Sequence, residues 1–339
     1  MFARYKYWVE QEISRLLPSP GGAELYVLLR YHLGWVDTSG RPAESPFSQG
    51  KALRPTLCLF ACEALEEHLS KALPAAAALE LIHNFSLIHD DIQDRDRERR
   101  HQPTVWSLWG VPKALVSGNA MQSAGDLAML ETSRRGVSPE TTLKVSQLLT
   151  QSYLEMIQGQ CLDLAYESRT SITADDYLNM ISQKTGSLIR SGLEIGALLA
   201  TDDPAAVAAF SRFGSCLGRA FQIRDDFLGV WGNEAATGKA VGNDIRRRKK
   251  SYPIVFALEQ ATGNARNDLL QIYQREELSE DDVERVLAVL DEVGAQAHSQ
   301  RLTEASAAAA LKAIGSMTLP RWAVEEAESL VDFVAKREY

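Results

Sequence analysis

Two aspartate-rich stretches carry the strongest chemical signal in this chain. They cover residues 90–94 (Asp-Asp-Ile-Gln-Asp) and 222–226 (Gln-Ile-Arg-Asp-Asp), and each follows an apolar run that is predicted to be helical. Adjacent carboxylates on a partly buried helix repel each other and lose hydration unless a cation compensates. Mg²⁺ prefers oxygen ligands and commonly bridges carboxylates to substrate phosphates. The pattern therefore predicts a diphosphate that is held through Mg²⁺ between two helices.

Helix geometry supports this interpretation. Asp90 and Asp94 are four residues apart, so they share one helix face, and His83 lies two turns before Asp90. Gln222 likewise shares a face with the pair 225–226. A single acidic pair at a helix end is more often a solvated surface or a cap than a set of ligands. Two such clusters, one of them near a histidine, favour the metal site.

Basic residues form a second group close to these stretches. They are Lys51 and Arg54 before an apolar helix, Arg99 and Arg100 after the first stretch, Lys184 within a helix, and Lys239 and residues 246–250 after the second stretch. Such charge runs are commonly solvated loops, which we favour for Arg246, Arg247 and Lys250. Basic side chains directly after metal-type carboxylates also suit a diphosphate, since Arg and Lys can bind the oxygens that the metal leaves free.

Composition limits the classes of protein. The 339 residues are 45% hydrophobic and 24% charged, as in ordinary globular proteins, and the formal net charge of −9 argues against a general nucleic-acid binder. No apolar run approaches the length of a transmembrane segment, and the N-terminus lacks the apolar core of a signal peptide. The four cysteines do not form a zinc pattern, which predicts free thiols in the cytoplasm.

Almost the whole chain is predicted to be helical. The expected helices cover residues 74–93, 139–167, 174–200, 204–231, 252–263, 279–297, 299–315 and 320–336, and the expected loops cover 34–50, 95–104, 201–204 and 232–251. Alternating β-runs, repeats and long Gly/Ser linkers are absent from the sequence. We therefore predict one all-α domain over residues 1–339, a bundle of about ten or more helices around a central substrate cavity.

The order of these motifs, from Gly50 to about Pro253, resembles that of the trans-isoprenyl diphosphate synthases, also called polyprenyl synthetases. The resemblance is carried by the DDxxD motif at 90–94, Arg99-Arg100, Lys184-Thr185, Gln222 with Asp225-Asp226, Lys239 and Lys249. A DDxxD motif alone is weak evidence, whereas this ordered set is specific.

The chain departs from the family pattern in three places. The Gly-Gly-Lys-Arg-x-Arg-Pro motif reads Gln-Gly-Lys-Ala-Leu-Arg-Pro at residues 49–55, and Arg248 replaces a glycine before the last lysine. Gly229 stands where many members have a third aspartate, so one potential metal ligand is missing.

The resemblance implies the isoprenoid synthase fold, a homodimer and Mg²⁺-dependent condensation of isopentenyl diphosphate with an allylic prenyl diphosphate, with three ions once substrate is bound. The implied metal-site residues are Asp90, Asp91, Asp94, Asp225 and Asp226. The implied catalytic residues are Asp90, Asp94, Asp225, Lys184 and Arg99. Isopentenyl diphosphate would be held by Lys51, Arg54, His83 and Arg100. The allylic substrate would be held by Lys184 and Lys249. The remaining substrate-binding residues would be Arg99, Thr185, Gln222 and Lys239.

Product length would depend on the residues four and five positions before the first aspartate, which are Ser86 and Phe85. One aromatic and one small residue resemble the twenty-carbon, geranylgeranyl-forming type more than the fifteen-carbon, farnesyl-forming type. On an ideal helix Ser86 lies about 40° from the direction of Asp90 and Phe85 about 140°. The limiting role of Phe85 therefore depends on the resemblance, and an ordinary core position is the alternative.

Other activities stay open at this point. A farnesyl diphosphate synthase differs only in product. A class I terpene cyclase would not need the isopentenyl set Lys51, Arg54, His83 and Arg100. A metal-dependent phosphohydrolase could use His89-Asp90 but would need further histidines, and His32, His68, His101 and His298 lack a suitable context. A non-catalytic subunit of a larger synthase conflicts with the intact aspartates.

Overall fold

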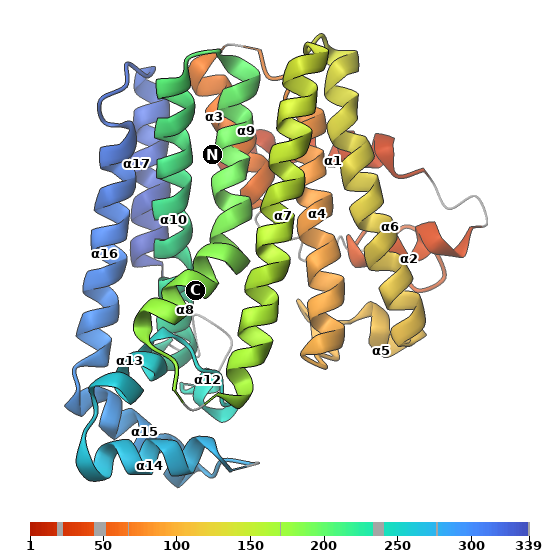
Figure 1. The fold of residues 1–339 in the computed structure, drawn as a ribbon. Coiled ribbons are helices and arrows are strands. Elements are labelled where there is room, and N and C mark those ends of the chain that lie inside the picture. The colour runs from red at the N-terminus through yellow and green to blue at the C-terminus, as the bar shows by residue number, and fades with distance from the viewer. Residues whose placement is uncertain are drawn as a thin grey trace. The chain divides into compact units, whose positions relative to one another are not determined.

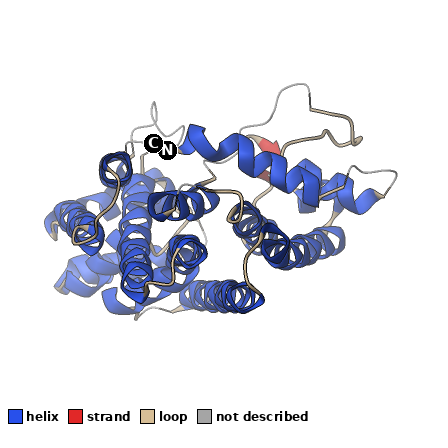
Figure 2. Ribbon diagram, turned by 90° about the horizontal axis from the view of Figure 1, so that it is seen from above, coloured by secondary structure: helices blue, strands red, loops and turns tan. Residues whose placement is uncertain are grey.

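Helices make up most of the computed structural model, which describes residues 1–18, 23–43, 52–66, 68–169, 171–232, 241–275 and 277–337 (Figures 1 and 2). The predicted all-α class is confirmed. The chain divides into two compact units. Unit 1 comprises Met1–Tyr153 and Ser191–Ala208, and unit 2 comprises Leu154–Arg190 and Ala209–Tyr339. A single domain with a central cavity stays a prediction.

Unit 1 is organised around α4 (Leu73–Gln93). Proline occupies its first turn, where no helical hydrogen bond is lost, and residues 75–79 are fully buried. This helix packs on α6 (Val111–Leu130), α3 (Leu53–Leu65) and α1 (Phe2–Leu16). A helix that is apolar on most sides is expected at the centre of a core. Its last turn carries the first aspartate stretch.

Shorter elements complete unit 1. They are α2 (Glu24–His32), the strands β1 (Glu98–Arg99) and β2 (Gln102–Pro103), α5 (Val105–Trp109) and a 3₁₀ turn at Glu131–Arg135. The predicted loop at 95–104 thus contains a small antiparallel hairpin. Two longer helices, α7 (Pro139–Ser168) and α9 (Ser187–Ala200), contribute one part to each unit.

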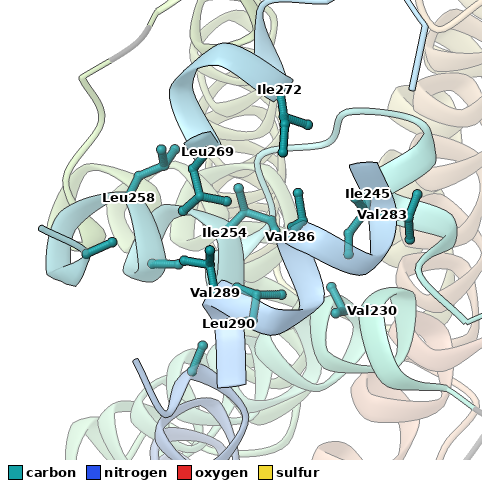
Figure 3. Close-up of a cluster of buried hydrophobic side chains, with 13 residues drawn as sticks. Val230, Ile245, Ile254, Leu258, Leu269, Ile272, Val283, Val286, Val289 and Leu290 are labelled. Atoms are coloured by element: carbon teal, nitrogen blue, oxygen red, sulfur yellow. The ribbon is translucent and has the colours of Figure 1, made fainter. Parts of the chain in front are cut away.

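Unit 2 holds the remaining elements: α8 (Ala174–Ile181), a π-helical turn at Ser182–Gly186, most of α10 (Pro204–Trp231), α12 (Asn243–Arg246), α13 (Tyr252–Gln260), α14 (Gly263–Tyr273), α15 (Glu280–Glu292), α16 (Ala295–Ile314) and α17 (Arg321–Lys336). Side chains from α10 and from α12 to α15 form one of its cores (Figure 3), with Val230, Ile245, Ile254, Leu269 and Leu290 fully buried. Capping boxes begin α8 and α15.

Most predicted helix boundaries agree with the structure to within a few residues. The helix predicted over 204–231 is α10, which begins at its proline. The helix predicted over 174–200 is interrupted by the π-helical turn, and the predicted loop 232–251 contains α12. The helix predicted over 279–297 ends early, because Gly294 has a left-handed backbone (φ 67°) that starts a new helix. Within the described residues, no helix is both long and apolar enough to span a membrane.

Candidate active site

The first aspartate stretch lies at the C-terminal end of α4 and contains both buried and solvent-accessible carboxylates. Asp91 is 1% exposed, and Arg99 Nε donates to its Oδ1 at 2.7 Å. Burial raises the pKa of Asp91 to about 6, although the Arg99 guanidinium opposes that rise. Asp94 is exposed and Asp90 partly so, one helical turn apart. Asp90 and Asp94 are therefore accessible to a ligand, while Asp91 anchors an arginine.

The paired arginines are positioned by the hairpin that follows α4. Arg99 pairs with Gln102 in the ladder, so Arg100 and His101 form the two-residue turn. Both have positive φ, 55° and 63°, as a type I′ turn requires. Left-handed backbone at non-glycine residues is costly, and such strain tends to occur at functional sites.

Arg54, His83 and Arg100 form a basic cluster in unit 1. Burial lowers the pKa of Arg54 to about 10, while Glu80 and Asp90 oppose the change. Burial also lowers the pKa of His83 well below its ordinary value, and the charges of Arg54 and Arg100 lower it further. Among the described residues, Arg54 Nε is buried without a hydrogen-bond partner, and neither the Arg100 guanidinium nor the His83 ring has one. Arg100 is exposed, His83 is partly buried and its ring is neutral, so two arginine charges and one imidazole are available to an anion.

The second aspartate stretch, on α10 in unit 2, repeats the division between buried and accessible carboxylates. Asp226 is 5% exposed and accepts hydrogen bonds from Tyr177 Oη (2.6 Å), Gln222 Nε2 (3.0 Å) and the backbone N–H of Tyr252 (3.1 Å). Burial raises its pKa to about 7, and these hydrogen bonds moderate the shift. The Asp225 side chain is 59% exposed, with one oxygen 3.0 Å from Arg337 Nη2. Asp225 is thus the accessible carboxylate of this pair.

Lys184 and Thr185 lie in the π-helical turn between α8 and α9. Such turns are rare and occur often at functional sites. Thr185 Oγ1 donates to Gln222 Oε1 at 2.7 Å, and Lys184 Nζ lies 2.5 Å from Asp163 Oδ2. The turn packs directly on α7 at Gly159, where a Cβ would lie 2.2 Å from the Lys184 backbone nitrogen. Only glycine fits there, so the close approach positions Lys184.

The turn after α12 explains two of the departures from the family pattern. Arg248 has φ 53°, so it adopts the left-handed backbone that the usual glycine would adopt more easily. A Cβ at Gly229 would lie 2.1 Å from Asp244 Oδ2, so the buried Asp244 carboxylate lies against α10 one turn after Asp225. A third aspartate on α10 would collide with it. Lys249 is exposed at the end of this turn.

Two further basic residues near this turn are structural. Lys250 Nζ donates to the carbonyls of Tyr166, Glu167 and Arg169 and so caps the end of α7. Arg246 pairs with Glu280 at the start of α15. The prediction that Lys250 and Arg246 are solvated loop charges is therefore wrong. Neither belongs to the residues that are expected to bind a diphosphate, so that group of residues is unchanged.

Phe85 and Ser86 both lie on α4. Phe85 is 4% exposed, and its ring makes edge contacts with His89 (centroids 5.6 Å apart) and Tyr153 (6.3 Å). Ser86 Oγ donates to the carbonyl of His83 at 2.8 Å. His89 Nε2 lies 3.3 Å from the Leu115 carbonyl of α6, so one of its ring nitrogens already has a backbone partner.

The structure therefore brings the predicted residues together in two groups, one in each unit. Unit 1 holds Arg54, His83, Asp90, Asp91, Asp94, Arg99 and Arg100; unit 2 holds Lys184, Thr185, Gln222, Asp225, Asp226 and Lys249. Lys51 and Lys239 lie outside the described residues. Sequence reasoning missed Asp163, Tyr177, Asp244 and His32. None of them stands in a motif that the sequence analysis used, since their roles come from contacts between segments distant in the chain.

The carboxylates fit a magnesium site in their donor chemistry. Asp90, Asp94 and Asp225 supply accessible oxygens, which hard cations prefer. In the described part of the chain, no three Asp, Glu, His or Cys side chains converge as a complete metal site. This agrees with the usual Mg²⁺ arrangement, in which one or two carboxylates are completed by substrate phosphates and water.

Comparison with known proteins gives consistent matches. The family model described as polyprenyl synthetase matches residues 38–290. The chain is 38% identical to a geranylgeranyl diphosphate synthase of Mycobacterium tuberculosis over 86% of this chain and 81% of that protein. It is 42% identical to a (2E,6E)-farnesyl diphosphate synthase of Mycobacterium bovis over 68% of this chain, and the match spans 62% of that relative's length. The crystal structure of a geranylgeranyl pyrophosphate synthetase from Pyrococcus horikoshii superimposes with a TM-score of 0.89 at 31% identity, covering 99% and 98% of the two chains.

Proposed function

Because this chain belongs to the polyprenyl synthetase family, we propose that it is a prenyltransferase. It would condense isopentenyl diphosphate with an allylic diphosphate to a short trans-prenyl diphosphate. The observation that carries the proposal is the unpaired cluster of Arg54, His83 and Arg100 beside the carboxylates of α4. A terpene cyclase, which ionises one allylic diphosphate, has no use for a second anion site.

Magnesium is part of the proposal, with three ions in the substrate complex. Asp90, Asp94 and Asp225 would hold the ions, and Asp91 and Asp226 would support them from their buried, hydrogen-bonded positions. When bound, the metal supplies positive charge that stabilises the leaving diphosphate.

The residues of the chain have separate tasks in the proposed reaction. Arg99, Lys184 and Lys249 neutralise charge on the allylic diphosphate as its C–O bond breaks and the electron pair leaves with the diphosphate. Lys51, Arg54, His83 and Arg100 hold isopentenyl diphosphate, whose double bond attacks the allylic cation. The resulting cation loses a proton to the departed diphosphate, which restores a double bond. No protein nucleophile takes part.

Geranylgeranyl diphosphate is the proposed product, and farnesyl diphosphate is the alternative. The named relatives include synthases of both kinds. The buried aromatic ring of Phe85, with a small residue next to it, supports the longer product.

We also propose that the protein forms a homodimer and that it lies in the cytoplasm. The side of α6 that faces away from α4 exposes large apolar residues, which suits a subunit interface. They are Val111, Leu115, Val116, Leu127 and Leu130. Free cysteines at all four positions suit a reducing compartment.

The test is product analysis with the purified single chain. With labelled isopentenyl diphosphate, an allylic primer and Mg²⁺, labelled prenyl diphosphates should form, and a chelator should abolish them. Asp90→Ala and Asp225→Ala should each lower turnover by orders of magnitude with little change in thermal stability, whereas Asp202→Ala, an exposed control, should not. Near-normal turnover in both variants would refute the prenyltransferase assignment.

Two other outcomes would indicate a different activity. Hydrocarbons formed without isopentenyl diphosphate would indicate a cyclase, and phosphate released from nucleotides would indicate a phosphohydrolase.

A further inference from the structure

His32 lies beside the arginine hairpin although it is distant from it in the sequence. It is the last residue of α2, and the neighbouring Tyr31 Oη donates to the carbonyl of Pro103 in β2 at 2.9 Å. That hydrogen bond joins the end of α2 to the hairpin. One cavity in unit 1 is lined by His32 together with Asp91, Arg99 and Arg100. His32 is therefore part of the wall around both arginines.

The hydrogen bonds of His32 leave one ring nitrogen unused. Asn84 Nδ2 donates to Glu80, at 2.8 Å to the backbone carbonyl and 3.2 Å to Oε1, so the amide oxygen of Asn84 is the group that can accept from His32. His32 Nε2 is buried without a partner among the described residues. Burial, with the nearby charges of Arg99 and Arg100, lowers the pKa of His32 to about 3. A neutral imidazole has one donor and one acceptor, so the unused Nε2 is an acceptor.

The two arginines of the hairpin differ in how they are held. Arg99 donates through Nε to Asp91, which fixes its orientation. The Arg100 guanidinium has no hydrogen bond to any described residue, yet it lines the same cavity as His32. An acceptor nitrogen repels an anionic oxygen but can accept an N–H of a guanidinium, which has five donors in a fixed plane.

We propose that His32 is a positioning residue of the isopentenyl diphosphate subsite, where its Nε2 accepts an N–H of Arg100 and directs that guanidinium at the bound diphosphate. This inference rests on the proposed function. His32 would do for Arg100 what Asp91 does for Arg99. A neutral acceptor orients the arginine without cancelling the positive charge that the diphosphate requires, whereas a second carboxylate would cancel it.

The first test measures binding of isopentenyl diphosphate alone, without a primer, so that no turnover occurs. His32→Phe keeps a ring but removes the acceptor and should weaken binding about tenfold. His32→Gln keeps an acceptor and should recover most of the affinity, while the Michaelis constant for the allylic primer stays unchanged. The exposed His68→Phe is the matched control. Equal losses for both substrates, or no loss, would overturn the proposal.

A double-mutant cycle separates action through Arg100 from direct contact. In an Arg100→Ala background, His32→Phe should cause little further loss. The same loss as in the wild type would show that His32 acts independently, and the proposal would fail. If the wild type itself does not bind isopentenyl diphosphate, the proposed function fails instead.

A second measurement needs no substitution at His32. The ¹⁵N resonance of His32 Nε2 should shift when isopentenyl diphosphate saturates the wild type and should stay unchanged in Arg100→Ala. An unshifted resonance in the saturated wild type would contradict the proposal even if His32→Phe does not fold.

Discussion

Each aspartate pair combines one buried carboxylate and one accessible carboxylate. Asp91 and Asp226 are buried and bonded to protein donors, while Asp90 and Asp225 have access to solvent. Burial of an ionised carboxylate is costly unless donors compensate. The two buried members therefore act first as anchors, for Arg99 in unit 1 and for Tyr177 and Gln222 in unit 2. Among the aspartates, the resemblance already assigned the catalytic role to Asp90, Asp94 and Asp225 alone, but the spacing of the aspartates does not encode which carboxylates are buried.

Removal of the Arg54 charge should weaken the binding of isopentenyl diphosphate far more than that of the allylic primer. Arg54→Ala should raise the Michaelis constant for isopentenyl diphosphate about ten- to a hundredfold, since one charge-assisted contact is lost. The constant for the allylic primer should change much less. Steady-state kinetics with each substrate varied in turn checks this, with the exposed Arg134→Ala as control. Equal effects on both constants would contradict the division of roles.

The buried imidazole of His32 should also make stability depend on pH. Its pKa is about 3 in the folded protein against an ordinary value of 6.5, so below pH 6.5 the unfolded chain takes up a proton that the folded chain refuses. Stability contributed by the neutral ring is thus present above pH 6.5 and is lost as pH falls towards 3.

We therefore expect the free energy of unfolding of the wild type to fall relative to that of His32→Gln over this range. Denaturant unfolding at several pH values measures the difference, and titratable groups that do not interact with His32 cancel. A difference that does not vary with pH would mean that folding does not lower the pKa of His32.

At the scale of elements, α4 carries three kinds of site residue along its length. Its last turn bears the aspartates, His83 joins the basic cluster, and Phe85 packs on the rings of His89 and Tyr153. A single rigid helix can therefore relate the position of a diphosphate to the point where a growing chain would stop.

Substitutions on this helix should change product length. Phe85→Ala removes a ring and should allow longer prenyl diphosphates, because a chain stops growing when it meets a side chain that it cannot displace. Ser86→Phe should shorten the main product towards fifteen carbons, since Ser86 lies closer to the direction of Asp90. Chromatography of the dephosphorylated products decides between these outcomes.

An unchanged product pattern in both variants would show that other residues form the end of the tunnel. The prenyltransferase assignment would survive that result, but the geranylgeranyl assignment would lose its main support.

Most of the long helices were predicted from the sequence, although α6 (Val111–Leu130) was not, and the elements that position the site were not predicted either. Apolar periodicity and the proline at residue 204 were enough to predict α10. The π-helical turn at Lys184 depends on the fit of Gly159 against its backbone, a contact between segments far apart in the chain. The hairpin of Arg99 and Arg100 has no glycine in its turn, so its sequence shows none of the usual hairpin signals.

At the scale of the whole molecule, motif order was the most reliable guide. The ordered carboxylates and basic residues identified the family before any contact was known, and the family match confirms it. Residues outside the motifs were missed because their roles come from tertiary contacts. His32 gains its neighbours only because Tyr31 ties α2 to β2, and Asp244 reaches α10 only because residue 229 has no side chain.

The last prediction concerns the apolar side of α6. Val116 and Leu127 are 57% and 65% exposed, so charges placed there leave the core of unit 1 intact. In a dimer that buries this face, unpaired carboxylates would be costly. The double variant Val116→Glu/Leu127→Glu should therefore be monomeric by light scattering, with unchanged helical content by circular dichroism.

Val324→Glu places the same charge on an exposed apolar position of α17 and should leave a dimer intact. A wild type that is monomeric at micromolar concentration would refute the proposed homodimer. A double variant that stays dimeric would keep the dimer but move its interface away from α6. The α6 face would then be an exposed apolar surface of the dimer that needs a different partner, since a large apolar patch commonly marks an interaction site.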